Sequence, residues 1–198
     1  MDRRFSYYAR LSAKDKAIYR KGDAIKEVRL PDCVALAPLV DALEVALKTG
    51  IRVRVGKATA NLTKAILRQL HAPPALVKVR EVRPDIHGGE LHGLYTYATK
   101  KDLPTIEVWM RTNSKEQVVK FKTFLRTLLH EVGHHLDVTV LQLGDSFHNE
   151  GFFRRESSFV RQLTEGRKAP HSPASNTVSS PTEGKKKVEA KGRQLSLF

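Results

Sequence analysis

The segment that most constrains the fold covers residues 127–137, because it holds two histidines and a glutamate in the order His130-Glu131-x-x-His134. Residues four apart lie one above the other on a helix, so both imidazoles can bind one metal ion. The glutamate after the first histidine then lies beside a water held by that metal, where it can act as general base. The spacing therefore predicts a helix with His130 and His134 as metal ligands and Glu131 as the catalytic base.

The residues around this motif predict a long amphipathic helix. Ser114 followed by Gln117 matches a capping box, which indicates a helix that opens near Lys115. Apolar residues then recur at steps of three and four, on the side roughly opposite the two ligand histidines. This stripe comprises Val118, Phe121, Leu125, Leu128, Val132 and Leu136. One face is therefore expected to pack on a core and another to line a cleft, while His135 points elsewhere and takes no part in the site.

A catalytic zinc ion takes three protein ligands and keeps one position open for water. The third ligand is expected within residues 145–156. A histidine six residues after the second, as in one class of zinc peptidases, is excluded because that position is Val140. His148 is the preferred third ligand. Glu150 and Glu156 remain alternatives, because all three donor types suit zinc.

The composition is that of a globular protein of 198 residues, 40% of them hydrophobic, which is long enough for one buried domain with extensions. No apolar run approaches the roughly 18 residues that a membrane span requires, and the first residues lack the apolar core of an export signal. Cys33 stands alone, which excludes an internal disulfide and a cysteine-based metal site. We therefore expect a cytoplasmic protein without membrane association.

Positive charge is concentrated at the two ends of the sequence. The net charge is +14, to which residues 1–30 and 166–198 each contribute +5. Such a balance favours binding to phosphate-rich polymers through counterion release, so DNA is an expected partner. The basic N-terminal arm, residues 1–30, also carries Phe5, Tyr7, Tyr8 and Tyr19. These aromatic residues could stack on bases or could pack the arm against the body of the protein.

Residues 31–165 have the pattern of an α+β domain that begins with helices. A helix is expected over residues 36–47, ended by Gly50, and a second over residues 58–70. Between them, residues 51–55 alternate apolar and basic side chains, which predicts a short, half-exposed strand.

Three further runs, residues 76–82, 93–98 and 105–110, are rich in β-branched and aromatic residues and predict a small, mostly antiparallel sheet. His87 and His92 lie in a glycine-rich loop between the first two runs, and we expect a solvated loop there because two histidines alone make a poor metal site. After the third-ligand segment, a following helix carries three arginines that are expected to form a basic rim near the cleft. These are Arg154, Arg155 and Arg161.

The two histidine-bearing segments together resemble the SprT-like zinc peptidases, a family that includes Spartan, a protease that degrades proteins crosslinked to DNA. The resemblance covers residues 75–163 and rests on the H-E-x-x-H motif, on His148 and on Phe152 four residues later. The chain departs from the family at Asn149, where a glycine is usual, and it lacks the four-cysteine zinc ribbon of some members.

This resemblance implies a zincin-like metallopeptidase domain with one Zn²⁺ ion. Its ligands would be His130, His134 and His148, and its base Glu131. In such peptidases the sheet precedes the metal-binding helix, and an extended substrate pairs with the edge strand that lines the cleft.

The last part of the chain differs in composition from the domain that precedes it. Residues 166–193 are rich in Pro, Ser, Gly, Lys and Thr, which predicts a disordered basic linker. The final residues, 194–198, spell Gln-Leu-Ser-Leu-Phe and closely resemble the bacterial sliding-clamp-binding motif. That resemblance implies that Gln194 makes polar anchor contacts with the clamp, while the leucines and the phenylalanine fill an apolar pocket. The apolar contacts would be Leu195, Leu197 and Phe198.

Together these features predict a zinc endopeptidase that is recruited by the sliding clamp and acts on proteins bound to nucleoid DNA, with DNA–protein crosslinks as the most specific substrate. A regulatory peptidase that cleaves a repressor or an antitoxin is a second hypothesis, and it predicts no stimulation by DNA. A third hypothesis is a non-catalytic clamp- and DNA-binding protein with structural zinc. Glu131 argues against it, because a structural site has no need of a base.

Overall fold

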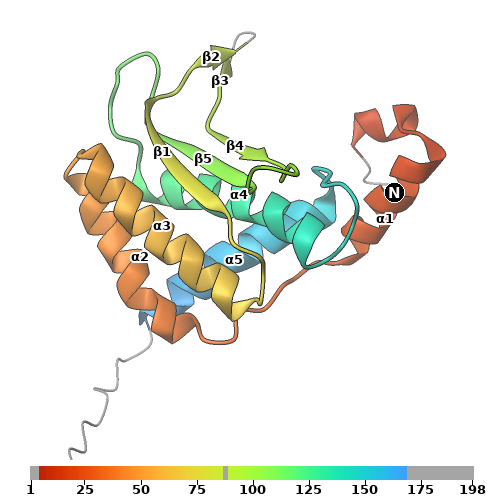
Figure 1. The fold of residues 1–198 in the computed structure, drawn as a ribbon, viewed down its shortest axis with the longest axis horizontal. Coiled ribbons are helices and arrows are strands. Elements are labelled where there is room, and N and C mark those ends of the chain that lie inside the picture. The colour runs from red at the N-terminus through yellow and green to blue at the C-terminus, as the bar shows by residue number, and fades with distance from the viewer. Residues whose placement is uncertain (1–4, 87–88, 169–198) are drawn as a thin grey trace, which may run out of the picture.

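The structure is a computed structural model that describes residues 5–86 and 89–168. These residues form an α+β domain of five α-helices, a short 3₁₀ helix and a small mixed sheet with a separate two-stranded hairpin (Figure 1). The clamp-like motif at residues 194–198 and nearly all of the predicted linker lie outside the described residues. Among the described residues, no helix combines the length and the hydrophobicity that crossing a membrane would require.

The two helices predicted ahead of the sheet form the helical hairpin α2–α3. Helix α2 spans Cys33–Lys48 and begins at Asp32, whose side chain accepts a hydrogen bond from the Ala35 amide. Gly50 follows it with a φ of 64°, a conformation that glycine adopts without strain. Helix α3 spans Arg52–Gln69.

The strand predicted over residues 51–55 is wrong, because this segment is the first turn of α3. Val53 is 73% exposed while Val55 is fully buried, so the two valines do not share a strand face. Val55 instead continues the helical spacing of Leu62 and Ile66, both buried. Alternation over five residues is too short to separate the two periods, and burial of the whole helix face decides between them.

The main sheet has the strand order β1-β5-β4. Strand β5 lies in the middle, parallel to β1 with Val79 opposite Val108, and antiparallel to β4 with Tyr95 opposite Ile106. The bounds are Leu76–Val82 for β1, Gly93–Thr96 for β4 and Thr105–Arg111 for β5, and the separate hairpin pairs β2 (Asp85–Ile86) with β3 (Gly89–Glu90).

The three predicted strands are therefore present, but the mostly antiparallel sheet is not: the sheet is mixed. The chain leaves β1, forms the hairpin and β4, and returns so that β5 runs beside β1 in the same direction. Strand patterns indicate which residues are extended but not which strands become neighbours, so the sequence could not reveal this crossing.

Helix α4 spans Phe121–Thr139 and α5 spans Glu150–Lys168. The predicted helix start near Lys115 is wrong, because Val118 forms a β-bridge with Arg111 and the Val119 amide donates to the Met110 carbonyl. The capping-box residues thus lie in a turn that extends β5. The predicted apolar stripe is buried at Leu125, Leu128, Val132 and Leu136 and partly buried at Val118 and Phe121.

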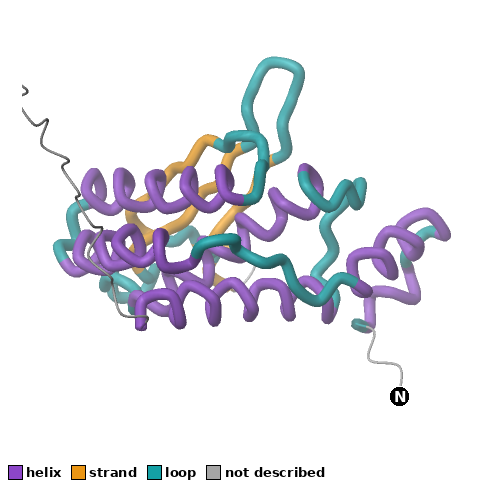
Figure 2. Tube along the Cα trace, turned by 90° about the horizontal axis from the view of Figure 1, so that it is seen from below, coloured by secondary structure: helices purple, strands orange, loops and turns teal. Residues whose placement is uncertain are grey.

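The helices enclose one hydrophobic core. Helix α3 packs along β1, α4 packs along β4 and β5, and α2 packs on both α3 and α5. Figure 2 shows the helices beneath and beside the strands, with the N-terminal segment at one end of the molecule. The edge strand β4 therefore lies directly against the helix that carries the H-E-x-x-H motif.

The described part of the N-terminal arm packs on the body. It forms the 3₁₀ helix η1 (Ser6–Arg10) and α1 (Ala13–Ala24), and Tyr19 is only 2% exposed. The Asn149 side chain donates to the Tyr19 carbonyl and the Gly151 amide donates to Asp23, so the arm is tied to the start of α5. Of the two roles considered for the aromatic residues of the arm, packing is the one observed for Tyr8 and Tyr19.

Candidate metal centre

Three histidines from two segments meet at one point beside α4. His130 and His134 lie one turn apart on α4, and His148 lies in the segment that leads into α5. The Nε2 atom of His148 is 2.9 Å from that of His130 and 3.0 Å from that of His134, and the two α4 nitrogens are 3.2 Å apart. This group could hold a metal ion.

The partners of the other ring nitrogens explain why these three Nε2 atoms fit a cation. His130 donates from Nδ1 to Glu156 at 2.8 Å, and His134 donates from Nδ1 to the Ser146 hydroxyl at 2.8 Å, whose own proton goes to Asp137 at 2.9 Å. Both α4 imidazoles therefore turn an Nε2 lone pair toward the common centre, and lone pairs this close repel without a cation. A tetrahedral zinc ion would hold two such nitrogens about 3.3 Å apart.

Burial keeps the site ready for a metal. It lowers the pKa of His134 to about 3, with His130 and His148 acting in the same direction, and it lowers the pKa of His148. Glu156 keeps its charge: burial acts to raise its pKa, but hydrogen bonds from His130 and Arg126 bring the pKa below the usual value. Neutral imidazoles oriented by a carboxylate are the state that metal binding requires.

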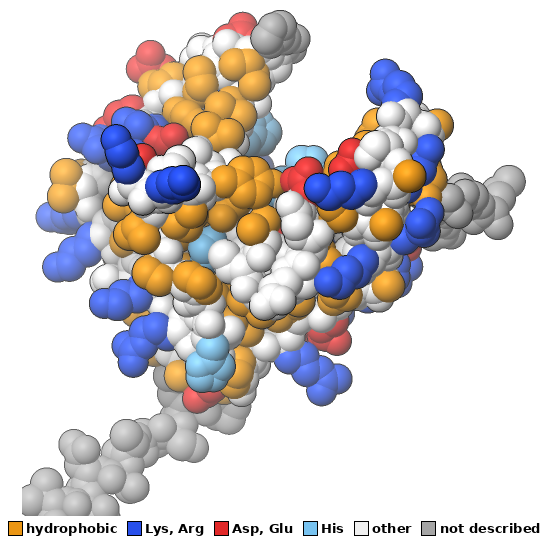
Figure 3. Space-filling model, turned by 45° about the vertical axis from the view of Figure 1, so that its right-hand side comes forward, with side chains coloured by type: hydrophobic (Ala, Val, Ile, Leu, Met, Phe, Trp, Pro, Cys, Tyr) orange, Lys and Arg blue, Asp and Glu red, His pale blue; other side chains and the backbone are white. Residues whose placement is uncertain are grey.

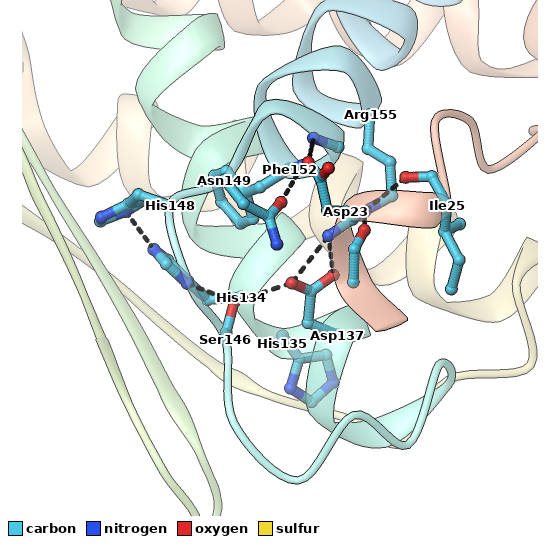
Figure 4. Close-up of polar contacts among 12 residues, drawn as sticks. Asp23, Ile25, His134, His135, Asp137, Ser146, His148, Asn149, Phe152 and Arg155 are labelled. Atoms are coloured by element: carbon cyan, nitrogen blue, oxygen red, sulfur yellow. Dashed lines mark hydrogen bonds and ion pairs between the residues drawn. The ribbon is translucent and has the colours of Figure 1, made fainter. Parts of the chain in front are cut away.

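Behind His134 lies a buried ion pair that joins α4, α5 and the N-terminal segment (Figure 4). Arg155 donates to the two Asp137 oxygens at 2.8 and 2.9 Å, and the side chains are only 3% and 1% exposed. The same guanidinium donates to the carbonyls of Gly22 and Ile25, both at 2.6 Å. The orientation of His134 therefore depends on a chain of contacts that reaches α1.

The segment that carries His148 is held from both sides. The Tyr7 hydroxyl donates to the His148 carbonyl at 2.8 Å. Asn149 accepts from the Phe152 amide at 2.7 Å and so caps α5. The Phe152 ring lies 4.6–5.3 Å, centroid to centroid, from the three histidine rings and forms an apolar floor under them.

Glu131 is buried between α4 and the edge strand β4. It is 5% exposed, and its carboxylate accepts a hydrogen bond from the Tyr95 amide. Burial raises the pKa of Glu131 to about 7, against the opposing influence of His130 and of the Tyr95 amide. A Cβ atom on Gly93 would lie 2.9 Å from the Glu131 carboxyl carbon, so only glycine leaves room for the carboxylate.

Two cavities meet at Gly93, His130 and Glu131. The larger, a cleft of about 1060 Å³, runs along α4 toward the end of α5, and the smaller, of about 240 Å³, lies on the His134 and His148 side. The walls of the larger cleft carry apolar, basic and acidic side chains, which include Phe121, Leu125, Phe153 and Val160, then Lys120, Lys122 and Arg126, and also Glu44, Glu90 and Glu156.

The two alternative third ligands lie elsewhere. Glu156 contacts the His130 ring on the side away from the centre, and Glu150 pairs with Arg154 on the outer face of α5. The structure thus brings together His130, His134 and His148, with Glu131 beside them.

Other candidate residues have structural roles. His135 is fully buried, donates from Nε2 to the Pro73 carbonyl and accepts from the Tyr95 hydroxyl at Nδ1, so it fixes β4 to α4 without facing the metal centre. His92 lies 4.0 Å from Glu90, while His87 is outside the described residues.

The predicted basic rim on α5 is wrong at Arg155, because this side chain is buried in the ion pair with Asp137. Arg154 and Arg161 are exposed but are paired with Glu150 and Glu27. Sequence reasoning also missed Gly93, Ser146 and the Asp137–Arg155 pair. A glycine that opens a strand was the one available signal, since it indicates a close approach of another group.

Comparison of the chain with protein-family models, with curated proteins and with solved structures found no match. The function is therefore argued from the geometry of the residues themselves.

Proposed function

We propose that this protein is a zinc-dependent endopeptidase with a zincin-like architecture, similar to the SprT-like peptidases, and that it cleaves proteins on DNA. The observation that carries the proposal is the convergence of three imidazole Nε2 atoms beside a buried glutamate. A structural zinc site has four protein ligands, no open position and no need of a base. Here, in contrast, three histidines adjoin a carboxylate and two open cavities.

The residues present suit peptide hydrolysis. A zinc ion held by His130, His134 and His148 would supply a Lewis acid and a water of lowered pKa. Glu131, oriented by the Tyr95 amide, takes a proton from the attacking water and returns it to the leaving amine. Burial raises the pKa of Glu131, so its carboxylate is a stronger base than an exposed one.

The surroundings favour an endopeptidase. Strand β4 is at the edge of the sheet, so an extended substrate can pair with it as an added strand. Cavities lie on both sides of Glu131, which allows a polypeptide to continue in either direction from the scissile bond.

Recruitment to DNA is the second part of the proposal. The net charge of +14 supports contact with nucleic acid, and residues 194–198 support docking to a bacterial sliding clamp, with Gln194, Leu195, Leu197 and Phe198 as the contacts. Tethering to the clamp raises the local concentration of the enzyme near replicating DNA. A pull-down with purified clamp tests this part, since Phe198→Ala should abolish the interaction.

The activity is tested with a protein covalently crosslinked to DNA, and with the same protein free of DNA. Zinc content is measured in parallel, and Glu131→Gln serves as the control that retains the ligands. Cleavage that requires DNA and disappears in Glu131→Gln would support the proposal. Cleavage independent of DNA would favour the regulatory peptidase, and zinc binding without any cleavage would favour the non-catalytic binding protein.

A further inference from the structure

Helix α3 carries positive charge along one side, and these side chains take no part in the candidate metal centre. Its 18 residues include five basic side chains and no acidic one. All five are exposed, and four of them recur along one side of the helix: Arg54, Lys57, Lys64 and Arg68. We refer to these four as the α3 basic stripe.

Among the described residues, the α3 basic stripe has no electrostatic partner. Across the described ranges 5–86 and 89–168, no carboxylate lies within ion-pair distance of any of the four side chains, whereas Arg52 at the start of the helix pairs with Glu81. Like charges three or four residues apart, such as Lys64 and Arg68, slightly destabilise a free helix. The arrangement therefore suits a polyanionic partner better than it suits the isolated fold.

The stripe faces outward because the opposite side of α3 is committed to the core. Val55, Leu62 and Ile66 are fully buried, and the helix packs on α2 and β1 (Figure 1). Figure 3 shows Lys and Arg side chains spread over one face of the molecule, with Asp and Glu side chains beside some of them.

We infer that the α3 basic stripe is a docking surface for the phosphate backbone of duplex DNA. From Arg54 to Arg68 the helix rises about 21 Å, and duplex DNA carries about 12 phosphates over that length. Contacts of this kind position a protein without reading sequence. The inference takes DNA as the polyanion from the proposed function, but it requires no peptidase activity.

The inference adds a basic surface on the folded body to the basic ends of the chain, whose contact with DNA stays a prediction. Residues 5–30 of the N-terminal arm are packed against the start of α5. The net charge of the sequence between the two ends is small only because the positive charge of α3 is summed with the negative charge of acidic residues elsewhere. Clamp binding and the stripe would then hold the protein on DNA through separate surfaces.

The test measures the affinity for a short fluorescent duplex by anisotropy, in a salt series, with the full chain in the Glu131→Gln background. The stripe variant combines Lys57→Gln, Lys64→Gln and Arg68→Gln. The control combines Lys14→Gln, Lys101→Gln and Lys115→Gln, which removes the same charge from exposed positions on three other segments. Circular dichroism confirms that both variants are folded.

The stripe variant should bind at least roughly tenfold more weakly, and its plot of log K against log salt should be shallower by about 2.7, or 0.9 for each lost phosphate contact. The control should keep most of the slope. Equal losses in both variants would overturn the inference, and so would a stripe-dependent affinity for phosphatidylserine vesicles that matches that for DNA. If the stripe variant loses DNA while the wild-type protein cleaves nothing, the inference stands and the proposed activity falls.

Discussion

Helices α3 and α4 have nearly the same length, 18 and 19 residues, and each packs one face on the sheet, but they treat polar groups in opposite ways. Helix α4 buries Glu131, His135 and Asp137. Helix α3 buries only Thr59 and Thr63 among its polar residues and turns every charge to solvent. Helix α4 therefore carries the buried polar groups near the candidate site, whereas α3 has an apolar inner face and a basic outer face.

The difference shows what each sequence pattern serves. A buried charge is costly unless it is paired and hydrogen-bonded, and each buried group of α4 has a partner: Glu131 the Tyr95 amide, His135 the Pro73 carbonyl, and Asp137 the Arg155 guanidinium. Substitutions in this network should therefore affect stability and chemistry together. Replacing the exposed basic residues of α3 should leave both nearly unchanged.

The largest effect is expected at the buried ion pair. Arg155→Met leaves Asp137 as an uncompensated buried charge, which should lower the free energy of unfolding by about 3–5 kcal/mol. Arg154→Met is the matched control, because its neighbouring guanidinium is exposed and should cost no more than about 0.5 kcal/mol. Urea denaturation followed by circular dichroism measures both. Similar losses in the two variants would remove the distinction between the buried network and the surface.

The next effect separates chemistry from folding. Gly93→Ala places a methyl group against the Glu131 carboxyl group, so the proposed base must move. A displacement of about 1 Å can cost on the order of 100-fold in kcat, while the three histidines are left in place. Steady-state cleavage combined with zinc analysis tests this, and the expected result is a normal zinc content with a lowered kcat. Loss of zinc together with activity would instead show that β4 supports the ligands.

The two carboxylates of α5 that were alternative third ligands provide a smaller, sharper contrast. Glu156→Ala removes the partner of His130 Nδ1 and should weaken zinc binding by about 10–100-fold. Glu150→Ala should leave zinc affinity unchanged, because the Glu150 carboxylate accepts hydrogen bonds from Arg154 and lies away from the three histidines. Competition with a chromogenic chelator gives both affinities. If Glu150→Ala lost zinc and His148→Ala retained it, the assignment of the third ligand would be wrong.

Much of the candidate site could be read from spacing alone, because helix periodicity fixes how His130, Glu131 and His134 are placed. His148 followed from the need for a third ligand, although its choice over Glu150 and Glu156 depends on how the chain folds back between α4 and α5. The residues that orient the ligands could not be found this way. Ser146 and Arg155 contact residues that are distant in the sequence, and no local sequence pattern marks their polar side chains.

The fold shows the same division between local and non-local information. The apolar stripe of α4 and the bounds of β1 follow from local patterns. The parallel pairing of β1 with β5 and the start of α4 at Phe121 depend on contacts made only in the folded chain. The N-terminal end of α3 belongs to the second kind, because local alternation indicated a strand and the burial of Val55 selected a helix.

The smallest expected effect tests that helical assignment. Gly56 directly follows the misassigned residues 51–55 in the first turns of α3, and a Cβ atom there would meet nothing within 4 Å. Gly56→Ala should therefore stabilise the protein by about 0.5–1 kcal/mol, because alanine restricts the unfolded chain and fits the helix. Thermal unfolding should show a rise of about 2–4 °C per kcal/mol. Gly56→Ala is the counterpart of Gly93→Ala. The same substitution should raise stability at Gly56, where the helix leaves room for a methyl group, and should lower activity at Gly93, where the strand contacts Glu131. A destabilised Gly56→Ala protein would show that residues 51–56 do not hold the helical backbone in solution.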